Sequence, residues 1–400
     1  MGTPTRTSTG LGLAILAVAL GACAPTGPAA IPTAPAAVAQ AAVSLSGVLP
    51  VATSAPLPKS STSQESTLPT TAPAQQPPGP EPSPSRSLRD IGLGEILQLL
   101  EDIPIARTDF GVRATFSPAS DVLLHNGNGM VIQLISLVGG QPPHALNGFD
   151  LFPPFTISVS PDGLAVAADD GPNIQVWKSD TGEQLASLSL APFSLVTNAG
   201  FHANDFFFAV DTNGNAAFWD PDGWGEISRF NYPGQIAAAL LFPDGSAIAL
   251  QDGRQQEIAI VDLKGNRLGA VPLNRDGDML LSISPAGDRL LLHVDYGYPT
   301  EGIRIVDVAT GQSLLDLPML NFRQFAVSSD WSLLAAVGVQ NELRLYRLPD
   351  GQLLLAQPLE VARTLGVSMS GDAAYLAFYV FKAGNAGAAI QVWGRGSVGP

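Results

Sequence analysis

The stretch that decides the fold runs from Phe155 to Leu190 and reads FTISVSPDGLAVAADDGPNIQVWKSDTGEQLASLSL. It begins with an apolar run that enters Ser160-Pro161-Asp162-Gly163, and these four residues supply the backbone angles of a tight reversal. Two more short apolar runs follow, at Leu164–Ala168 and Ile174–Trp177, and a Gly-led turn at Thr181–Leu185 then opens a fourth strand. Short apolar runs separated by turn residues predict four consecutive β-strands.

The same order of strands and turns recurs along the chain. The first positions of the turn are Ser117, Ser160, His202, Phe242, Ser284, Ser328 and Ser370, which are spaced 43, 42, 40, 42, 44 and 42 residues apart. Four short strands with a period of about 42 residues are typical of one blade of a β-propeller. The sequence therefore predicts an all-β fold: a seven-bladed β-propeller built from four-stranded antiparallel blades.

The end of the third strand has a recurring composition. It falls on Trp177, Trp219 and Trp393 in three blades, and an aspartate follows this position in three blades, at Asp220, Asp262 and Asp307. With these tryptophans and aspartates the repeat resembles that of the WD-repeat propellers, over about three quarters of the chain. The Gly-His pair typical of eukaryotic WD repeats is absent. The Ser-Pro-Asp-Gly turns also resemble those of the Tol-Pal propeller and other bacterial extracytoplasmic propellers. The equivalent tryptophans are predicted to pack between adjacent blades.

The seventh repeat lacks its fourth strand, because only Gly394–Pro400 follow its third. Propellers avoid an open ring, so an N-terminal segment is predicted to supply the missing strand somewhere within residues 94–107. A competing interpretation makes Leu88–Glu101 an amphipathic helix, with Ser87 and Asp90 as its cap. A helical turn before the closing strand is compatible with both interpretations.

The first 22 residues read as a bacterial export signal. One base, Arg6, precedes the ten-residue apolar run Leu11–Leu20, which is too short to span a bilayer as a helix of about 20 residues. Leu20-Gly21-Ala22-Cys23 resembles the lipobox of bacterial lipoproteins, in which the cysteine carries diacylglycerol and becomes the mature N-terminus. Cys23 is the single cysteine of the chain, so no internal disulfide can form. The resemblance implies a lipid-anchored protein, acylated with palmitate or similar chains, whose propeller lies outside the cytoplasm.

The segment between the cysteine and the propeller has the composition of a tether. Residues 24–86 hold 14 prolines among 63 residues and almost no charge. Such a segment cannot bury enough apolar surface to fold, which predicts disorder. The predicted organisation is a lipoprotein signal peptide at 1–22, a disordered Ala/Pro/Ser/Thr-rich tether at 23–87 and the propeller at 88–400.

The charge of the chain limits its partners. Residues 1–86 contain 3 of the 20 bases and 2 of the 35 acids, so residues 87–400 carry 17 bases and 33 acids, a net charge of −16. A surface this acidic repels phosphate backbones, so nucleic acid is not an expected partner. The expected partners are a membrane, through the lipid on Cys23, and a protein or envelope polymer bound by a monomeric propeller.

No catalytic or metal-binding pattern is found. The four histidines, at 125, 144, 202 and 293, have no ligand spacing, and the turn residues Asp162 and Asp244 are predicted to hydrogen-bond their own backbone rather than calcium. No cofactor, metal site or catalytic residue is therefore predicted. The expected function is a non-enzymatic protein-binding or scaffold module, with a propeller enzyme of the quinoprotein-dehydrogenase or lactonase type as the alternative.

Loops that lead into the inner strands of a propeller converge around one mouth of its central channel. In this chain those loops contain Tyr232, Arg275, Asp276, Asn321, Arg323 and Arg363. Arginine and aromatic side chains are favoured anchors at protein interfaces. These six residues are predicted to form a binding face on the rim of the channel.

Overall fold

The computed structural model describes residues 87–91, 95–106, 112–137, 143–149, 154, 156–192, 194–202, 205–273, 277–295, 300–348 and 350–395. The predicted signal peptide, the lipobox Leu20-Gly21-Ala22-Cys23 and the tether before residue 87 lie outside the described residues and remain predictions. Arg275 and Asp276 of the predicted rim also lie outside them.

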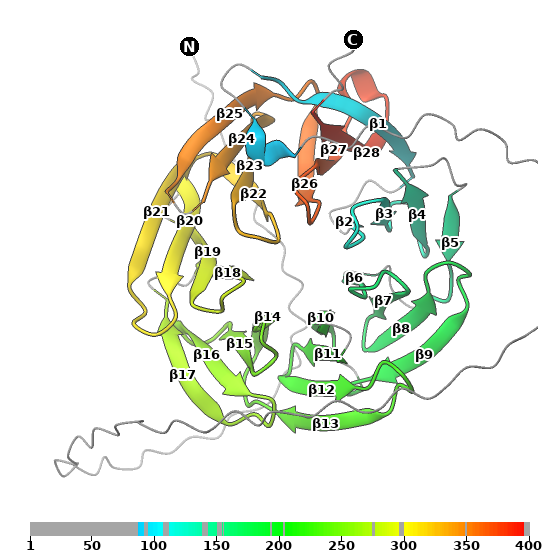
Figure 1. Cartoon of the computed structure of the whole chain (residues 1–400), viewed down its shortest axis with the longest axis vertical. Helices are drawn as coiled ribbons and strands as arrows, with labels where there is room; N and C mark the ends of the chain where they lie inside the picture. The colour runs from blue at the N-terminus through cyan, green and yellow to red at the C-terminus, as the bar shows by residue number, and fades with distance from the viewer. Residues whose placement is uncertain are drawn as a thin grey trace, which may run out of the picture. The chain divides into compact units, whose positions relative to one another are not determined.

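The described chain forms seven four-stranded antiparallel sheets arranged in a ring, which confirms the predicted seven-bladed β-propeller (Figure 1). Blade I contains β2 (Ala114–Phe116), β3 (Val122–His125), β4 (Ile132–Ser136) and β5 (His144–Leu146). Blade II contains β6 (Ile157–Val159), β7 (Ala165–Asp170), β8 (Asn173–Lys178) and β9 (Gln184–Ser189). Blade III contains β10 (Val196–His202), β11 (Phe206–Asp211), β12 (Asn215–Trp219) and β13 (Glu226–Asn231). Figure 1 shows the first strand of each blade nearest the channel and the fourth at the periphery.

The later blades repeat the pattern with longer strands. Blade IV contains β14 (Ile236–Leu241), β15 (Ala247–Asp252), β16 (Glu257–Asp262) and β17 (Arg267–Pro272). Blade V contains β18 (Met279–Ile283), β19 (Arg289–Asp295), β20 (Thr300–Asp307) and β21 (Ser313–Leu320). Blade VI contains β22 (Phe322–Val327), β23 (Leu333–Gly338), β24 (Glu342–Arg347) and β25 (Gln352–Pro358). Blade VII contains β26 (Arg363–Met369), β27 (Tyr375–Phe381), β28 (Ala388–Gly394) and, as its fourth strand, β1 (Gln98–Ile105).

The apolar core is divided among the seven interfaces between blades. Each hydrophobic cluster joins two neighbouring blades. The middle strands are mostly buried because both of their faces are covered, and all six residues of β15 and of β23 are buried. Trp177 lies between blades I and II and Trp219 between blades II and III, while Trp393 packs against the cluster of blades VI and VII. The predicted packing of these tryptophans between blades is confirmed.

A buried serine explains the repeating turn between the first and second strands. In blade VI, the Ser328 hydroxyl donates to Asp330 at 2.7 Å and accepts from the Leu333 amide at 3.0 Å. Four other blades use the same device at Ser117, Ser160, Ser284 and Ser370. The serine fixes the turn by bonding to both sides of it, so it recurs at this position.

The N-terminal segment closes the ring, as predicted. Strand β1 pairs antiparallel with β28, from Gln98 opposite Gly394 to Ile105 opposite Ala388. Figure 1 shows the cyan β1 beside the red β28, at the outer edge of blade VII. The alternative helix over 88–101 is wrong, because residues 98–101 belong to β1. Of the residues described in that range, those that are helical form the 3-10 turn η1 (Leu88–Asp90), which Ser87 caps by accepting from the Arg89 amide at 3.2 Å.

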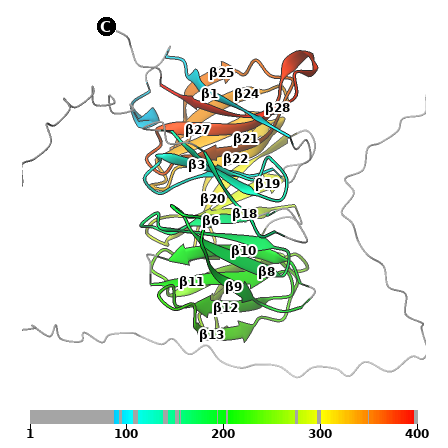
Figure 2. The ribbon, with the colours of Figure 1, turned by 90° about the vertical axis from the view of Figure 1, so that its right-hand side faces the viewer.

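The propeller has two faces, named here by their connections. The turn face carries the serine turns, such as 117–121 and 328–332, and the turns between third and fourth strands. The rim face carries the connections that lead from each fourth strand into the next inner strand. Figure 2 shows η1 on one face and the red 3-10 turn η2 (Ala383–Asn385) on the other, so the N-terminal segment enters the propeller at the turn face.

Candidate functional site

Three of the six predicted rim residues lie together. Arg363 begins β26 and is exposed, while Asn321 and Arg323 lie at the same end of the neighbouring inner strand β22. Asn341 braces this region: its amide nitrogen donates to the Val361 carbonyl at 2.9 Å, and its side-chain oxygen accepts from the Thr364 amide at 2.9 Å. The connection that presents Arg363 is therefore held firmly to blade VI.

Tyr232 does not belong to this surface. It is 9% exposed and packs in the hydrophobic cluster between blades III and IV. There is no room for a side chain at residue 214 beside Tyr232, because a Cβ on Gly214 would lie 1.9 Å from the Tyr232 carbonyl oxygen. The sequence places Tyr232 correctly in a loop, but its ring is buried between blades rather than exposed on the rim.

Arg113, which the sequence did not single out, belongs with Arg323 and Arg363, and these three arginines are called the basic sector below. Arg113 directly precedes β2, the inner strand on the other side of β26, and its amide donates to the Asn126 side chain at 2.7 Å. The inner strands β22, β26 and β2 are neighbours around the ring, and each has an arginine at its rim end. Arg113 also lines a hollow of about 350 Å³, together with Gln324, Ser368 and Tyr379. Its signal was available, since Arg113, like Asn321, directly precedes an inner strand.

A larger groove opens on the turn face between blades I and II. Its volume is about 710 Å³. The apolar floor includes Leu124, Leu134 and Val166, all buried, and three carboxylates stand at its edges, those of Asp121, Asp162 and Asp180. No lysine or arginine is among the described residues that line it. The groove therefore combines an apolar floor with a negative rim.

The groove lies where the two turns that face each other have small side chains at the positions that larger side chains occupy at other interfaces. At the interface of blades V and VI, Trp331 reaches across and its indole nitrogen donates to Ser282 at 2.9 Å. At the interface of blades III and IV, the His202 ring lies against the next turn, with Nε2 3.0 Å from the Pro243 carbonyl oxygen. Between blades I and II the corresponding turn positions are Ser117 and Gly163, which leave the space unfilled.

The turn aspartates bond to their own turns, as predicted. Asp162 accepts from the Ser160 hydroxyl at 2.6 Å and the Leu164 amide at 3.0 Å, and these bonds lower the pKa of its carboxyl. Asp244 accepts from the amide and hydroxyl of Ser246, which lowers its pKa in the same way. Within the described residues, no three His, Cys, Asp or Glu side chains are grouped so as to hold a metal ion.

His125 is a buried structural residue of β3. Its Nδ1 accepts from the Gly127 amide at 3.0 Å, so its proton is on Nε2, which has no hydrogen-bond partner among the described residues. Burial lowers the pKa of His125 from 6.5 to about 4. The native ring is therefore neutral at pH values where the unfolded ring is charged.

This pKa difference predicts a loss of stability in mild acid. Above pH 6.5 the ring is neutral in both states; as the pH falls toward 4 only the unfolded state gains the proton, and the free energy of unfolding drops by on the order of 3 kcal/mol. Urea unfolding of wild type and His125→Phe between pH 7 and 4 should show a decline that is larger in the wild type by about this amount, because carboxyls with lowered pKa weaken both proteins alike. The exposed His144→Gln is the control, and a wild-type decline preserved in His125→Phe would contradict the assignment.

Comparisons with known proteins support the β-propeller fold but do not assign a family. No protein-family description matches the chain, and no curated protein matches it. Among solved structures, it is similar to the β-propeller domain of Cps50 (Swd1) from Myceliophteria thermophila, with a TM-score of 0.60 and 15% identity, over 75% of this chain and 99% of that one. Among the described residues, no helix has the length and apolar character needed to cross a bilayer.

Proposed function

We propose that the chain is a lipid-anchored extracytoplasmic protein whose propeller acts as a non-enzymatic protein-binding module. The observation that carries the binding role is the basic sector on the rim face, where β22, β26 and β2 each place an arginine at the same end. Arginines are favoured at protein interfaces because the planar guanidinium can make several hydrogen bonds. The sector stands out on residues 87–400, whose net charge is −16 from 17 bases and 33 acids.

The geometry suits a partner that presents carboxylates. The arginines lie on inner strands of a closed ring, and Asn341 fixes the connection beside them, so little ordering is needed on binding. The hollow beside Arg113 is lined by Gln324, Ser368 and Tyr379, which add polar groups to the same sector. An acidic segment of another envelope protein is the partner we expect.

The test is crosslinked capture from intact envelopes with the full chain as bait. Changing Arg323 and Arg363 to Glu should remove the captured partner, because it reverses two charges at the centre of the sector. The matched control is Arg267→Glu with Arg347→Glu, which makes the same charge change in exposed ion pairs whose loss costs about 0–1 kcal/mol each. Equal capture by both double variants would refute the rim assignment, and a stoichiometric metal or quinone absorbance in the purified protein would contradict the non-enzymatic role.

A further inference from the structure

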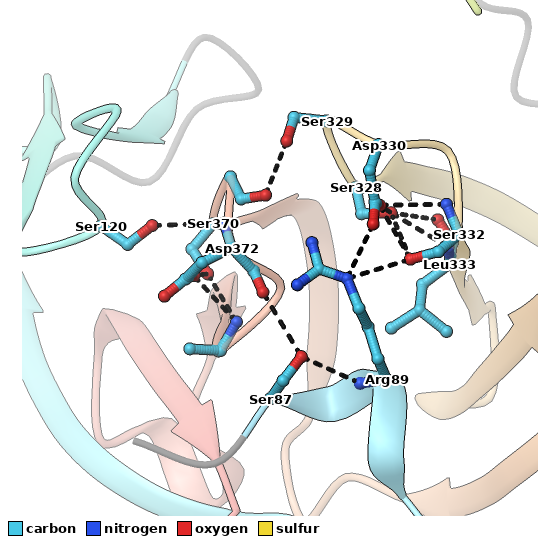
Figure 3. Close-up of polar contacts among 12 residues, drawn as sticks. Ser87, Arg89, Ser120, Ser328, Ser329, Asp330, Ser332, Leu333, Ser370 and Asp372 are labelled. Carbon is cyan, nitrogen blue, oxygen red and sulfur yellow. Dashed lines mark hydrogen bonds and ion pairs between the residues drawn. The ribbon is translucent and has the colours of Figure 1, made fainter. Parts of the chain in front are cut away.

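The interface between blades VI and VII contains a filled version of the groove between blades I and II. There, η1 lies on the turn face, with Ser87 beside Asp372 and Arg89 beside Asp330 (Figure 3). Leu88, between them in sequence, is fully buried in the cluster that joins the two blades. The Leu88 amide donates to the Ala373 carbonyl at 2.7 Å, and the Ser87 hydroxyl lies 3.4 Å from the Asp372 carbonyl. The chain therefore shows how a short segment docks between two of its own blades.

Strand register shows that the two places are equivalent. Leu134 opposes Leu124 in blade I as Leu345 opposes Ala335 in blade VI. Across the interface, Val166 opposes Val159 in blade II as Leu376 opposes Met369 in blade VII. The blade VI and VII residues all belong to the cluster that contains Leu88, or pack against it. The floor of the open groove is therefore made of the same positions that contribute to the cluster containing Leu88.

The polar neighbours of Leu88 also have counterparts at the open groove. Arg89 follows Leu88 and its Nε lies 2.8 Å from the carboxylate of Asp330, which the Ser328 hydroxyl holds at 2.7 Å (Figure 3). In blade I the Ser117 hydroxyl holds the Asp121 carboxylate at 2.7 Å. Asp121 comes two residues later in its turn than Asp330, but each turn offers a fixed carboxylate beside the apolar floor.

We propose that the groove between blades I and II binds a segment of a partner polypeptide in which an apolar residue is followed by a basic residue. The apolar side chain would occupy the position that Leu88 has at the other interface, and the basic side chain would meet Asp121. Asp162 and Asp180 add negative charge to the same rim, so a cationic segment is complementary to it. This site is on the face opposite the arginine sector and goes beyond the proposed function.

The occupant is another polypeptide, because this chain's own matching segment is already engaged. Leu88 and Arg89 are bound between blades VI and VII, and strand β1, which follows them, is paired with β28. A second copy of the chain could supply the segment only by opening its own ring. Docking of a second copy is therefore an outcome that would overturn the proposal.

The probe for this site is a fluorescent peptide of residues 83–91, SPSRSLRDI, titrated into the full chain and followed by fluorescence anisotropy. We expect saturable binding that weakens by about tenfold or more when the peptide's Leu88 is replaced by Ser or its Arg89 by Glu. On the protein, Ala119→Trp should fill the groove and remove saturable binding. Asp121→Asn, which keeps an acceptor for Ser117, should weaken binding by about tenfold, and the matched control Glu360→Gln on the rim face should leave it unchanged.

Several results would overturn the proposal. They are no saturable binding, equal binding of the Leu88→Ser peptide, unchanged binding to Ala119→Trp, or concentration-dependent self-association of the chain that Ala119→Trp abolishes. The peptide variants keep the test decisive if a protein variant misfolds, which thermal melting would reveal. Envelope capture through Arg323 and Arg363 is measured on the other face, so either site can fail without affecting the other.

Discussion

Deletion of residues 88–107 is expected to unfold the propeller. The deletion removes the fourth strand of blade VII and leaves the edge of β28 unpaired along its length. It also removes Leu88, Ile91, Leu97 and Ile105, which are all buried. At about 1.5–3 kcal/mol for each side chain, their burial contributes on the order of 6–12 kcal/mol, which is similar to the whole stability of a typical domain, about 5–15 kcal/mol. Circular dichroism melting and size-exclusion chromatography would show the loss of the cooperative transition.

Smaller changes at the same closure should have graded effects. Leu88→Ala should lower the free energy of unfolding by about 2–5 kcal/mol, since it leaves a cavity between blades VI and VII. Arg89→Ala should have a smaller effect, because its ion pair with Asp330 is partly exposed. The control is deletion of residues 24–80, which removes only predicted tether and should leave the melting transition unchanged. Full stability after deletion of 88–107 would show that the ring is not closed by β1.

The repeat made the blades predictable because it records local physics. Each Ser turn, such as that at Ser328, depends on residues within five positions of the serine, so its pattern is visible in the sequence. The middle strands are rich in apolar residues because they are covered on both faces, as in β23, whose six residues are all apolar or glycine and all buried. Seven copies of a weak local signal were enough to determine the number of blades and the order of their strands.

The closing segment was harder to predict because its neighbours are distant in sequence. Leu97 and Leu100 are compatible with a helical stripe, but pairing with β28, nearly 300 residues away, makes the segment extended. Leu97, directly before the strand, is buried, whereas Ile96 beside it and Leu100 within the strand are exposed. A long-range pairing partner overrides a local periodic pattern.

The candidate sites show the same division between local and distant information. The rim positions of Arg323 and Arg363 followed from the repeat, while the burial of Tyr232 depends on packing against residues of two different blades, III and IV. The groove depends on Ser117 and Gly163 both being small, and they face each other from different blades. Absence of a filling side chain across an interface has no signature in either repeat alone.

Changing Cys23 to Ala is expected to abolish acylation of the chain and to release the propeller from the membrane. Cys23 is the only cysteine, so thioether-linked lipid can be attached nowhere else. Each buried methylene of an acyl chain contributes about 0.8 kcal/mol, and two or three chains together hold a protein durably on a bilayer. Radiolabelled palmitate incorporation should fall to background, and membrane flotation should no longer carry the propeller with the vesicles.

Two measurements are needed because an uncleaved leader could hold the variant on the membrane by itself. The apolar run Leu11–Leu20 remains in that case, so flotation alone would not separate lipid from leader. Palmitate labelling reports the lipid directly, and a control change of Ala24 to Ser leaves both the cysteine and the residues before it intact. Palmitate incorporation that survives Cys23→Ala would contradict the lipobox assignment. If labelling is lost but the variant still captures its partner in solution, then the lipid serves to position the propeller at the membrane and takes no part in binding.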